Sequence, residues 1–225
     1  MFRLVMAGAQ WRDRIGGAVG GGLGIGLTAW ISALAGFDGP TAILLAAPIG
    51  ASAVLIFAVP SSPLAQPWRV IGGNIIPALV GTLVAQWLGH GALAAGIAVG
   101  LAILVMSLTR SLHPPGGGTV LLPVLAPAVL AHGYGYALLP IGLNAVLLTA
   151  CGLLVHRFTG HSYPHRALPA PPAPGLRPED IDAALAEAGE AFDVSREDLL
   201  ALLARAETHA AGRRPVGNAG ARNNA

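Results

Sequence analysis

The near-absence of charge across most of the chain is the feature that most constrains its fold. Between Ile15 and Val155 the only charged side chains are Asp38, Arg69 and Arg110, and 54% of the whole chain is hydrophobic. A charge at the centre of a bilayer costs about 2.5 kcal/mol or more. A stretch this apolar therefore predicts an all-α membrane domain, because helices satisfy their own backbone hydrogen bonds in lipid.

Glycines, prolines and short polar turns divide this stretch into six predicted membrane segments. The segments are about 15–36, 41–59, 70–88, 92–109, 119–132 and 136–155. Six crossings place the amino-terminal arginines, Arg69, Arg110 and Arg157 on one side, as the positive-inside rule requires. The short fifth segment leaves an alternative, in which it is re-entrant and only five segments cross. With six, we expect both termini in the cytoplasm and the chain in a bacterial inner (plasma) membrane.

The distribution of charge and proline predicts the domain organisation. Nine of the eleven acidic residues lie between Glu179 and Glu207. This part of the chain is therefore expected in water, and the apolar part in lipid. We therefore predict five parts: a cytoplasmic segment 1–14, a transmembrane domain 15–158, a Pro/Ala-rich linker 159–178, a tail of short amphipathic helices 179–211 and a disordered carboxy-terminus 212–225. In the first membrane segment, Gly16, Gly20 and Gly24 recur at the four-residue spacing of close helix packing, which favours burial in the bundle over a partner subunit.

A polar stretch, Ser111 to Thr119, interrupts the apolar sequence and reads SLHPPGGGT. Its two prolines are expected to end the preceding helix near Arg110. The three glycines allow close approach of the backbone to a ligand, and Thr119 is expected to cap the next helix. The stretch thus predicts either an anion-sized nest of amides or a tight turn between helices.

Two pairs of similar segments indicate an internal repeat. Residues 48–55 align with residues 115–122 at an offset of 67, and residues 71–74 align with residues 141–144 at an offset of 70. Three segments per repeat is an odd number, so the second unit enters the membrane inverted. Such inverted repeats build transporters in which broken helices meet at the substrate site.

This geometry predicts a bundle of 3+3 segments with broken helices and a site between two Pro-Gly breaks. Helix amino-termini favour anions, and His113 has a reference pKa that suits proton coupling. Asn74 and Asn144 are polar residues within spans and serve either as site ligands or as ties between helices. The predicted substrate-binding residues are Gly50, Ala51, Ser52, Asn74, Arg110, His113, Gly116, Gly117, Gly118, Thr119 and Asn144.

Several classes of function lack their sequence signatures. The chain has no P-loop, HExxH or GxSxG motif and no acid pair in its membrane part, so we expect no enzyme, catalytic residue or cofactor. The histidines lack metal-ligand spacing, which predicts no metal site. The 13 arginines form no stripe, which argues against nucleic acid as a partner. The single cysteine, Cys151, excludes an intrachain disulfide.

The stretch 111–119, preceded by residues 50–55 and by residues 62–68, resembles the HPP family of integral membrane proteins. The resemblance covers about residues 12–157. It implies a transporter, since plastid and cyanobacterial relatives are associated with nitrite transport, although the family is usually described as four-spanning. Residues 178–199 resemble the segment that precedes paired CBS domains in longer members.

The residues and the resemblance together predict a carrier or channel for a small monovalent anion, with nitrite as the first choice. Its expected partners are the lipid bilayer and the anion, and a homo-oligomer is left open. The rival hypothesis is a membrane scaffold or sensor that presents the helical tail to a regulator. A cation or proton pathway through Asp38 and the histidines is weaker, because no second buried carboxylate accompanies Asp38.

Overall fold

The computed structural model describes residues 11–34, 36, 40–167, 169–170, 177–189 and 192–213, with backbone alone for 40–46. It divides into two units, Met1–His165 and Arg166–Ala225. All regular structure in the described ranges is helical, which confirms the predicted all-α class. Asp38 and residues 214–225, and with them most of the predicted disordered carboxy-terminus, lie outside the described residues.

The helices of the first unit follow the six predicted segments closely. They are α1 (Trp11–Leu34), α2 (Pro40–Ala58), a 3₁₀ turn η1 (Pro63–Ala65), α3 (Pro67–Leu88), α4 (Ala92–Leu108), α5 (Gly116–Leu125), α6 (Pro127–Leu130), a π-helical turn η2 (Ala137–Gly142) and α7 (Leu143–Thr159). Within the described residues, α1, α3 and the run formed by η2 and α7 are long and apolar enough to cross a membrane. Large apolar side chains also remain exposed on α1 and α4, as a lipid-facing surface requires.

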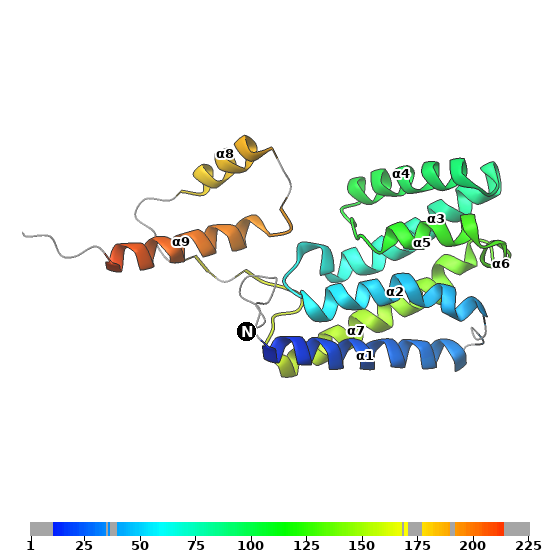
Figure 1. Ribbon diagram of the computed structural model, residues 1–225, viewed down its shortest axis with the longest axis horizontal. Helices are drawn as coiled ribbons and strands as arrows, with labels where there is room; N and C mark the ends of the chain where they lie inside the picture. Colours follow the sequence, from blue (N-terminus) through cyan, green and yellow to red (C-terminus); the bar gives the residue numbers. More distant parts are fainter. Residues whose placement is uncertain are drawn as a thin grey trace, which may run out of the picture. The chain divides into compact units, whose positions relative to one another are not determined.

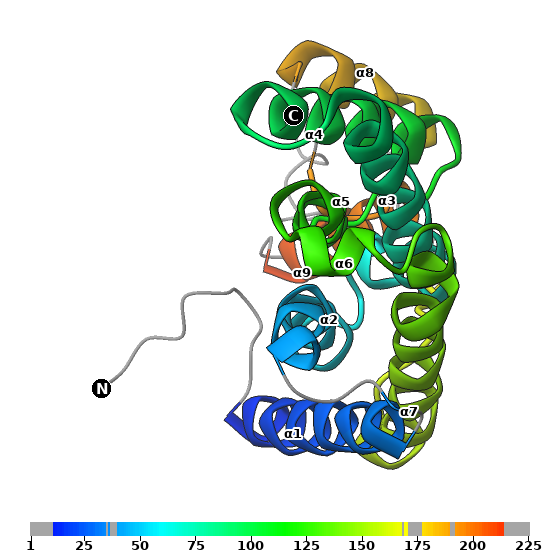
Figure 2. The ribbon, with the colours of Figure 1, turned by 90° about the vertical axis from the view of Figure 1, so that its right-hand side faces the viewer.

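The helices are arranged as an arc that encloses two further helices. Viewed end-on in Figure 2, α1, α7, α3 and α4 follow one another around the arc, and α2 and α5 lie on its inner side. Helix α2 packs mainly against α1, and α5 packs mainly against α3 and α4. All of these helices lie along a similar direction in Figure 1. Helices α2 and α5, which carry the two Pro-Gly segments, are therefore neighbours.

One expected helix interruption is absent, and two interruptions occur that the sequence analysis does not predict. Helix α2 continues through Pro48 without the break that the sequence predicts there. Transmembrane helices tolerate proline because neighbouring groups and local adjustments satisfy the freed carbonyl. The fifth segment instead divides at Ala126, where the backbone is extended (φ −122°, ψ 93°) before Pro127. A second interruption, at Leu139 (φ −130°, ψ 115°), precedes Pro140 in the sixth segment.

The small residues of α1 form its buried stripe, as predicted. Gly20, Gly24, Thr28 and Ser32 are buried at four-residue spacing. A Cβ atom at Gly24 would lie 3.0 Å from the ring of Phe57 and 3.1 Å from Leu148, so a larger residue would force these side chains to shift. Gly22 and Gly26, on a neighbouring line of α1, have no atom of another described element within 4 Å of a Cβ position.

Because of this difference, we expect Gly24→Val to lower the free energy of unfolding by about 1 to 3 kcal/mol through overpacking. Gly26→Val, two residues away on the open side, is expected to change it by less than about 0.5 kcal/mol. The measurement is thermal unfolding of both variants in the same detergent. Equal stabilities would contradict the packing of α1 against α2 and α7.

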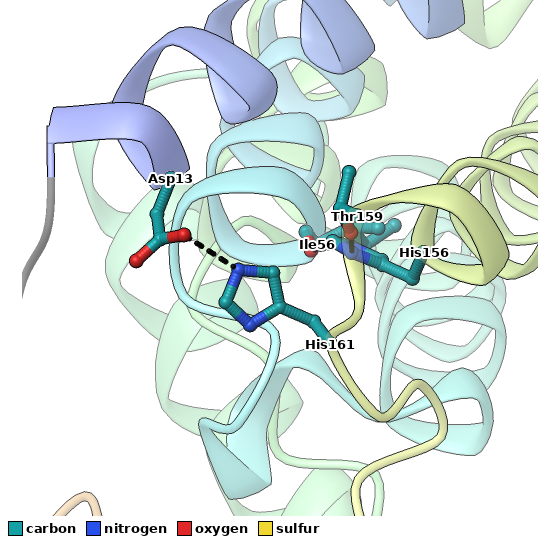
Figure 3. A network of polar contacts seen from close by, with 5 residues as sticks. All are labelled: Asp13, Ile56, His156, Thr159 and His161. Carbon is teal, nitrogen blue, oxygen red and sulfur yellow. Dashed lines mark hydrogen bonds and ion pairs between the residues drawn. The ribbon is translucent and has the colours of Figure 1, made fainter.

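Polar contacts join the start of α1 to the end of α7. His156 is 4% exposed, and its Nε2 lies 2.9 Å from the carbonyl oxygen of Ile56. Its Nδ1 lies 3.0 Å from the hydroxyl of Thr159. His161 pairs with Asp13 at 3.2 Å, as Figure 3 shows. His156 therefore ties the end of α7 to α2.

The second unit contains the two amphipathic helices that the tail predicts, α8 (Pro178–Ala188) and α9 (Arg196–Arg213). Ser195 caps α9, since its Oγ accepts a hydrogen bond of 3.1 Å from the amide of Asp198. Arg196 donates to Asp182 at 2.5 and 2.6 Å, and this guanidinium lowers the pKa of the Asp182 carboxyl. The two helices bury Ile181, Ala201 and Ala204 between them.

Candidate functional site

An open groove of about 460 Å³ lies between α2 and α5, where the two Pro-Gly segments meet. Its α2 wall includes Pro48 and Ala51, and its α5 wall includes Pro115 and Gly118. Leu55 and Leu122 extend the lining. The surface of the groove is largely apolar, so the side chains that line it define its shape but offer a ligand no charged group.

A buried network of four polar side chains lies directly behind these walls. Ser52, Asn74, His113 and Thr119 each have 0% exposure. Asn74 is central: its Nδ2 donates to Ser52 Oγ at 3.1 Å and to the Val70 carbonyl at 2.8 Å, and its Oδ1 accepts from Thr119 Oγ1 at 2.9 Å. The network thereby joins α2, α3 and α5 through groups that would be costly to bury unpaired.

His113 closes the network at the end of the groove. Its Nδ1 lies 2.9 Å from the carbonyl oxygen of Leu64, an acceptor, so Nδ1 carries a hydrogen. Its Nε2 lies 2.9 Å from Ser52 Oγ, and that hydroxyl is also 3.0 Å from the carbonyl of Pro48. With neutral His113, Ser52 donates to Nε2; with charged His113, Nε2 donates to Ser52, whose hydroxyl turns to Pro48. The heavy-atom geometry is satisfied in both states.

The three glycines of the motif have three different surroundings. A Cβ atom at Gly116 would lie 2.2 Å from the carbonyl oxygen of Gly73, which makes this position a contact between the α5 and α3 backbones. Apart from its own helix, no atom of the described residues lies within 4 Å of the Cβ position of Gly117. Gly118 lines the groove, and its Cβ position is 3.6 Å from Pro48.

The first turn of α5 differs from the predicted amide nest. The amides of Gly116, Gly117 and Gly118 donate to the carbonyls three residues earlier, at 2.9 to 3.0 Å. The predicted capping role of Thr119 is wrong, because α5 begins at Gly116 and the Thr119 hydroxyl donates to Asn74 instead. The prolines set the turn directly before Gly116, so the glycines form the first helical turn rather than a loop.

The remaining predicted residues lie apart from the network. Gly50 faces α1, in a different groove. Arg110 is exposed beyond the end of α4 and has a positive φ of 55°. Asn144 accepts a hydrogen bond of 2.7 Å from Ser32, a tie between α7 and α1. Four of the eleven predicted residues therefore meet in the network and two, Ala51 and Gly118, at the groove.

Sequence reasoning missed two partners of these residues. Ser32 was not recognised, although its spacing after Gly24 and Thr28 continues the small-residue stripe of α1. The Leu64 carbonyl accepts the hydrogen bond from His113. A sequence cannot identify this acceptor, because every residue has a backbone carbonyl. Among the described residues, no group of three or more His, Cys, Asp or Glu is placed to hold a metal ion.

Comparison with known proteins bears on this site. The profile of a protein family described as "HPP, transmembrane region" matches residues 6–164. Two proteins of Dictyostelium discoideum, each named only as a transmembrane protein, are 38% identical over 120 residues and 40% identical over 119 residues. These alignments cover 52% and 51% of this chain but only 39% and 42% of the relatives. No solved structure matches the chain.

Proposed function

Because its match to the family profile spans most of the chain, this protein belongs to the HPP transmembrane family, and we propose that it moves a small monovalent anion across the membrane. The observation that carries the proposal is the groove between α2 and α5, backed by buried Ser52, Asn74, His113 and Thr119. We propose transport rather than catalysis, and nitrite as the first substrate to test.

The physical argument for an anion rests on the amino-terminus of α5. Pro114 and Pro115, which precede this helix, line the groove, so the positive end of the helix dipole lies beside it. Ser52 and Thr119 directly follow the lining residues Ala51 and Gly118 in the sequence, and His113 directly precedes Pro114. A rearrangement of α2 against α5 would bring these donors to an ion.

We further propose that the first unit is an inverted repeat of α1, α2 and α3 with α4, α5 and α7. In support, α1 packs on α2 and α7, while α4 packs on the corresponding α5 and α3. The buried stripes also correspond: α1 buries Gly20, Gly24, Thr28 and Ser32, and α4 buries Ala94, Ala98, Ala102 and Met106, all at four-residue spacing. Both observations are expected of two units that share one arrangement of helices.

The proposed orientation puts both termini in the cytoplasm of a bacterial inner membrane. Contacts between His161 and Asp13, and between Trp68 and the Thr109 carbonyl, bring the helix ends that carry Arg12, Arg14, Arg69, Arg110 and Arg157 toward one side. Positive residues favour the cytoplasmic side. We expect a reporter that is active only in the cytoplasm to be active when it is fused after Arg213. Activity of a reporter that works only in the periplasm would overturn this orientation.

The test of transport is uptake of nitrite into liposomes that contain the purified full chain, with nitrate, formate and chloride as competitors. We expect saturable uptake. Ala51→Leu and Gly118→Leu place bulk in the groove from opposite walls, and each should lower the initial rate at least about tenfold, equivalent to about 1.4 kcal/mol in the barrier.

Gly96→Leu is the matched control, because Gly96 lies on the open side of α4 with no atom within 4 Å of its Cβ position. It should retain wild-type uptake. Normal uptake by both groove variants would remove the groove from the pathway. If folded, inserted wild-type protein moves none of the four anions, the proposal fails and the scaffold hypothesis, with α8 and α9 as the presented element, takes its place.

A further inference from the structure

His113 is a titratable side chain in a part of the protein that has no carboxylate to pair with it. It has 0% exposure, and its two ring nitrogens lie 2.9 Å from the Leu64 carbonyl oxygen and from Ser52 Oγ. The sequence contains no aspartate or glutamate between Asp38 and Glu179, so α2, α3, α4 and α5 carry no acidic side chain. A positive charge on this imidazole would therefore lack a countercharge on the helices around it.

The other charged and titratable groups near His113 do not supply a negative charge either. Asp13, on α1, is paired with His161 at 3.2 Å. The groups on the elements packed around His113 are Arg69 on α3, Arg110 after α4, Tyr163, whose hydroxyl donates to the Ala65 carbonyl of η1 at 2.9 Å, and His165, whose amide donates to Gln66. Burial without a countercharge disfavours the charged form of a histidine, so His113 is neutral when no anion is bound.

An anion at the α2/α5 groove meets the same difficulty with the opposite sign. The lining of the groove contains no charged side chain. The buried polar groups behind it, Ser52, Asn74 and Thr119, are neutral, and so is His113 in the empty site. A charge that leaves water for such surroundings is costly unless it is paired. A proton on His113 and an anion in the groove would each provide the countercharge that the other lacks.

The hydroxyl of Ser52 connects the two charges. Asn74 Nδ2 donates to Ser52 Oγ at 3.1 Å and occupies one of its two lone pairs. A protonated His113 Nε2 donates to the same oxygen and occupies the second. The hydrogen of the hydroxyl is then released from Nε2 and turns toward Pro48, whose carbonyl lies 3.0 Å away and which lines the groove. Protonation of His113 thus provides a hydrogen-bond donor on the groove side.

Resting on the proposed anion transport, we infer that His113 binds one proton for each anion and that the two cross the membrane together. The proton adds to the free lone pair of Nε2, and no covalent bond breaks. One positive and one negative charge are taken up, so the step is electroneutral. Because the two ligands stabilise each other, each raises the affinity for the other. The affinity for nitrite should rise about tenfold for each pH unit by which the pH is lowered, as long as His113 is neutral in the free protein.

The first test is titration calorimetry of nitrite into the purified full chain in detergent at pH 7, in two buffers whose ionisation enthalpies differ. We expect the difference in enthalpy to correspond to one proton taken up per nitrite bound. His113→Gln keeps hydrogen-bonding groups but cannot take up a proton. It should lose the proton uptake and bind nitrite at least about tenfold more weakly. His90→Gln is the matched control, because His90 is exposed and bonded to the Val124 carbonyl, and it should keep the wild-type values.

Two further measurements use wild-type protein alone. In protein with isotope-labelled histidine, magnetic resonance should show that nitrite converts one imidazole from the neutral to the charged form. In liposomes, the initial rate of nitrite uptake above that of protein-free liposomes should rise as the external pH is lowered. The same rate should not respond to a membrane potential set with potassium and valinomycin, because an electroneutral step moves no net charge.

Each contrary outcome has a distinct meaning. Nitrite binding without proton uptake, or nitrite flux driven by the membrane potential, would overturn the coupling and leave the anion proposal standing. Proton uptake that persists in folded His113→Gln would assign the proton to another group and would also overturn the inference. Absence of nitrite binding and flux in folded wild-type protein would remove both the inference and nitrite as the substrate.

Discussion

Gly116→Ala is expected to abolish the native packing of α5 on α3. The added Cβ would lie 2.2 Å from the carbonyl oxygen of Gly73, 2.9 Å from Pro77 and 3.0 Å from the sulfur of Met106. The first of these is a backbone atom in the middle of a helix, so it cannot turn aside as a side chain would. We expect a loss of about 3 kcal/mol or more in the free energy of unfolding, at or beyond the upper end for an overpacked core.

Gly117→Ala provides the comparison within the same helical turn. Its Cβ position has no atom within 4 Å, so the substitution adds no contact and removes only the backbone freedom of glycine. We expect this variant to be unchanged or more stable by about 0.5 to 1 kcal/mol. Size-exclusion chromatography and thermal unfolding in detergent measure the folding and the stability of the two variants. If Gly116→Ala folds as stably as Gly117→Ala, the described contact between α5 and α3 is wrong.

His113→Ala is also expected to destabilise the protein strongly. His113 has 0% exposure and connects the Leu64 carbonyl to Ser52. Its removal leaves a cavity of imidazole size and deprives the partly buried Leu64 carbonyl of a partner. Such a large-to-small change costs about 3 to 5 kcal/mol when the site cannot collapse, and the unpaired acceptor costs about 1 to 3 kcal/mol.

His90→Ala is the matched histidine control. His90 also has a hydrogen bond to a backbone carbonyl, that of Val124 at 2.7 Å, but its side chain is exposed, so water replaces the partner. We expect a loss below about 1 kcal/mol. A double-mutant cycle of His113→Ala with Ser52→Ala should show a coupling of at least about 0.5 kcal/mol. Strict additivity would contradict the bond between the two side chains.

The amino-acid sequence by itself determined the helical elements of this protein. Continuous apolar runs of membrane length satisfy their backbone hydrogen bonds within one helix, and the observed α3 (Pro67–Leu88) and α4 (Ala92–Leu108) begin and end within a few residues of the predicted segments. The spacing of Gly20 and Gly24 likewise predicted a buried face of α1, because residues four apart share one side of a helix.

Only the tertiary structure decided what each residue of the motif contacts. The sequence could not distinguish Gly116 from Gly117, since the difference depends on how closely the α3 backbone approaches. The sequence also could not show that the Thr119 hydroxyl donates to Asn74 instead of capping a helix, or that His113 donates to the Leu64 carbonyl. These contacts join residues 45 and 49 positions apart, and local pattern carries no information on such pairs because packing of whole helices sets them.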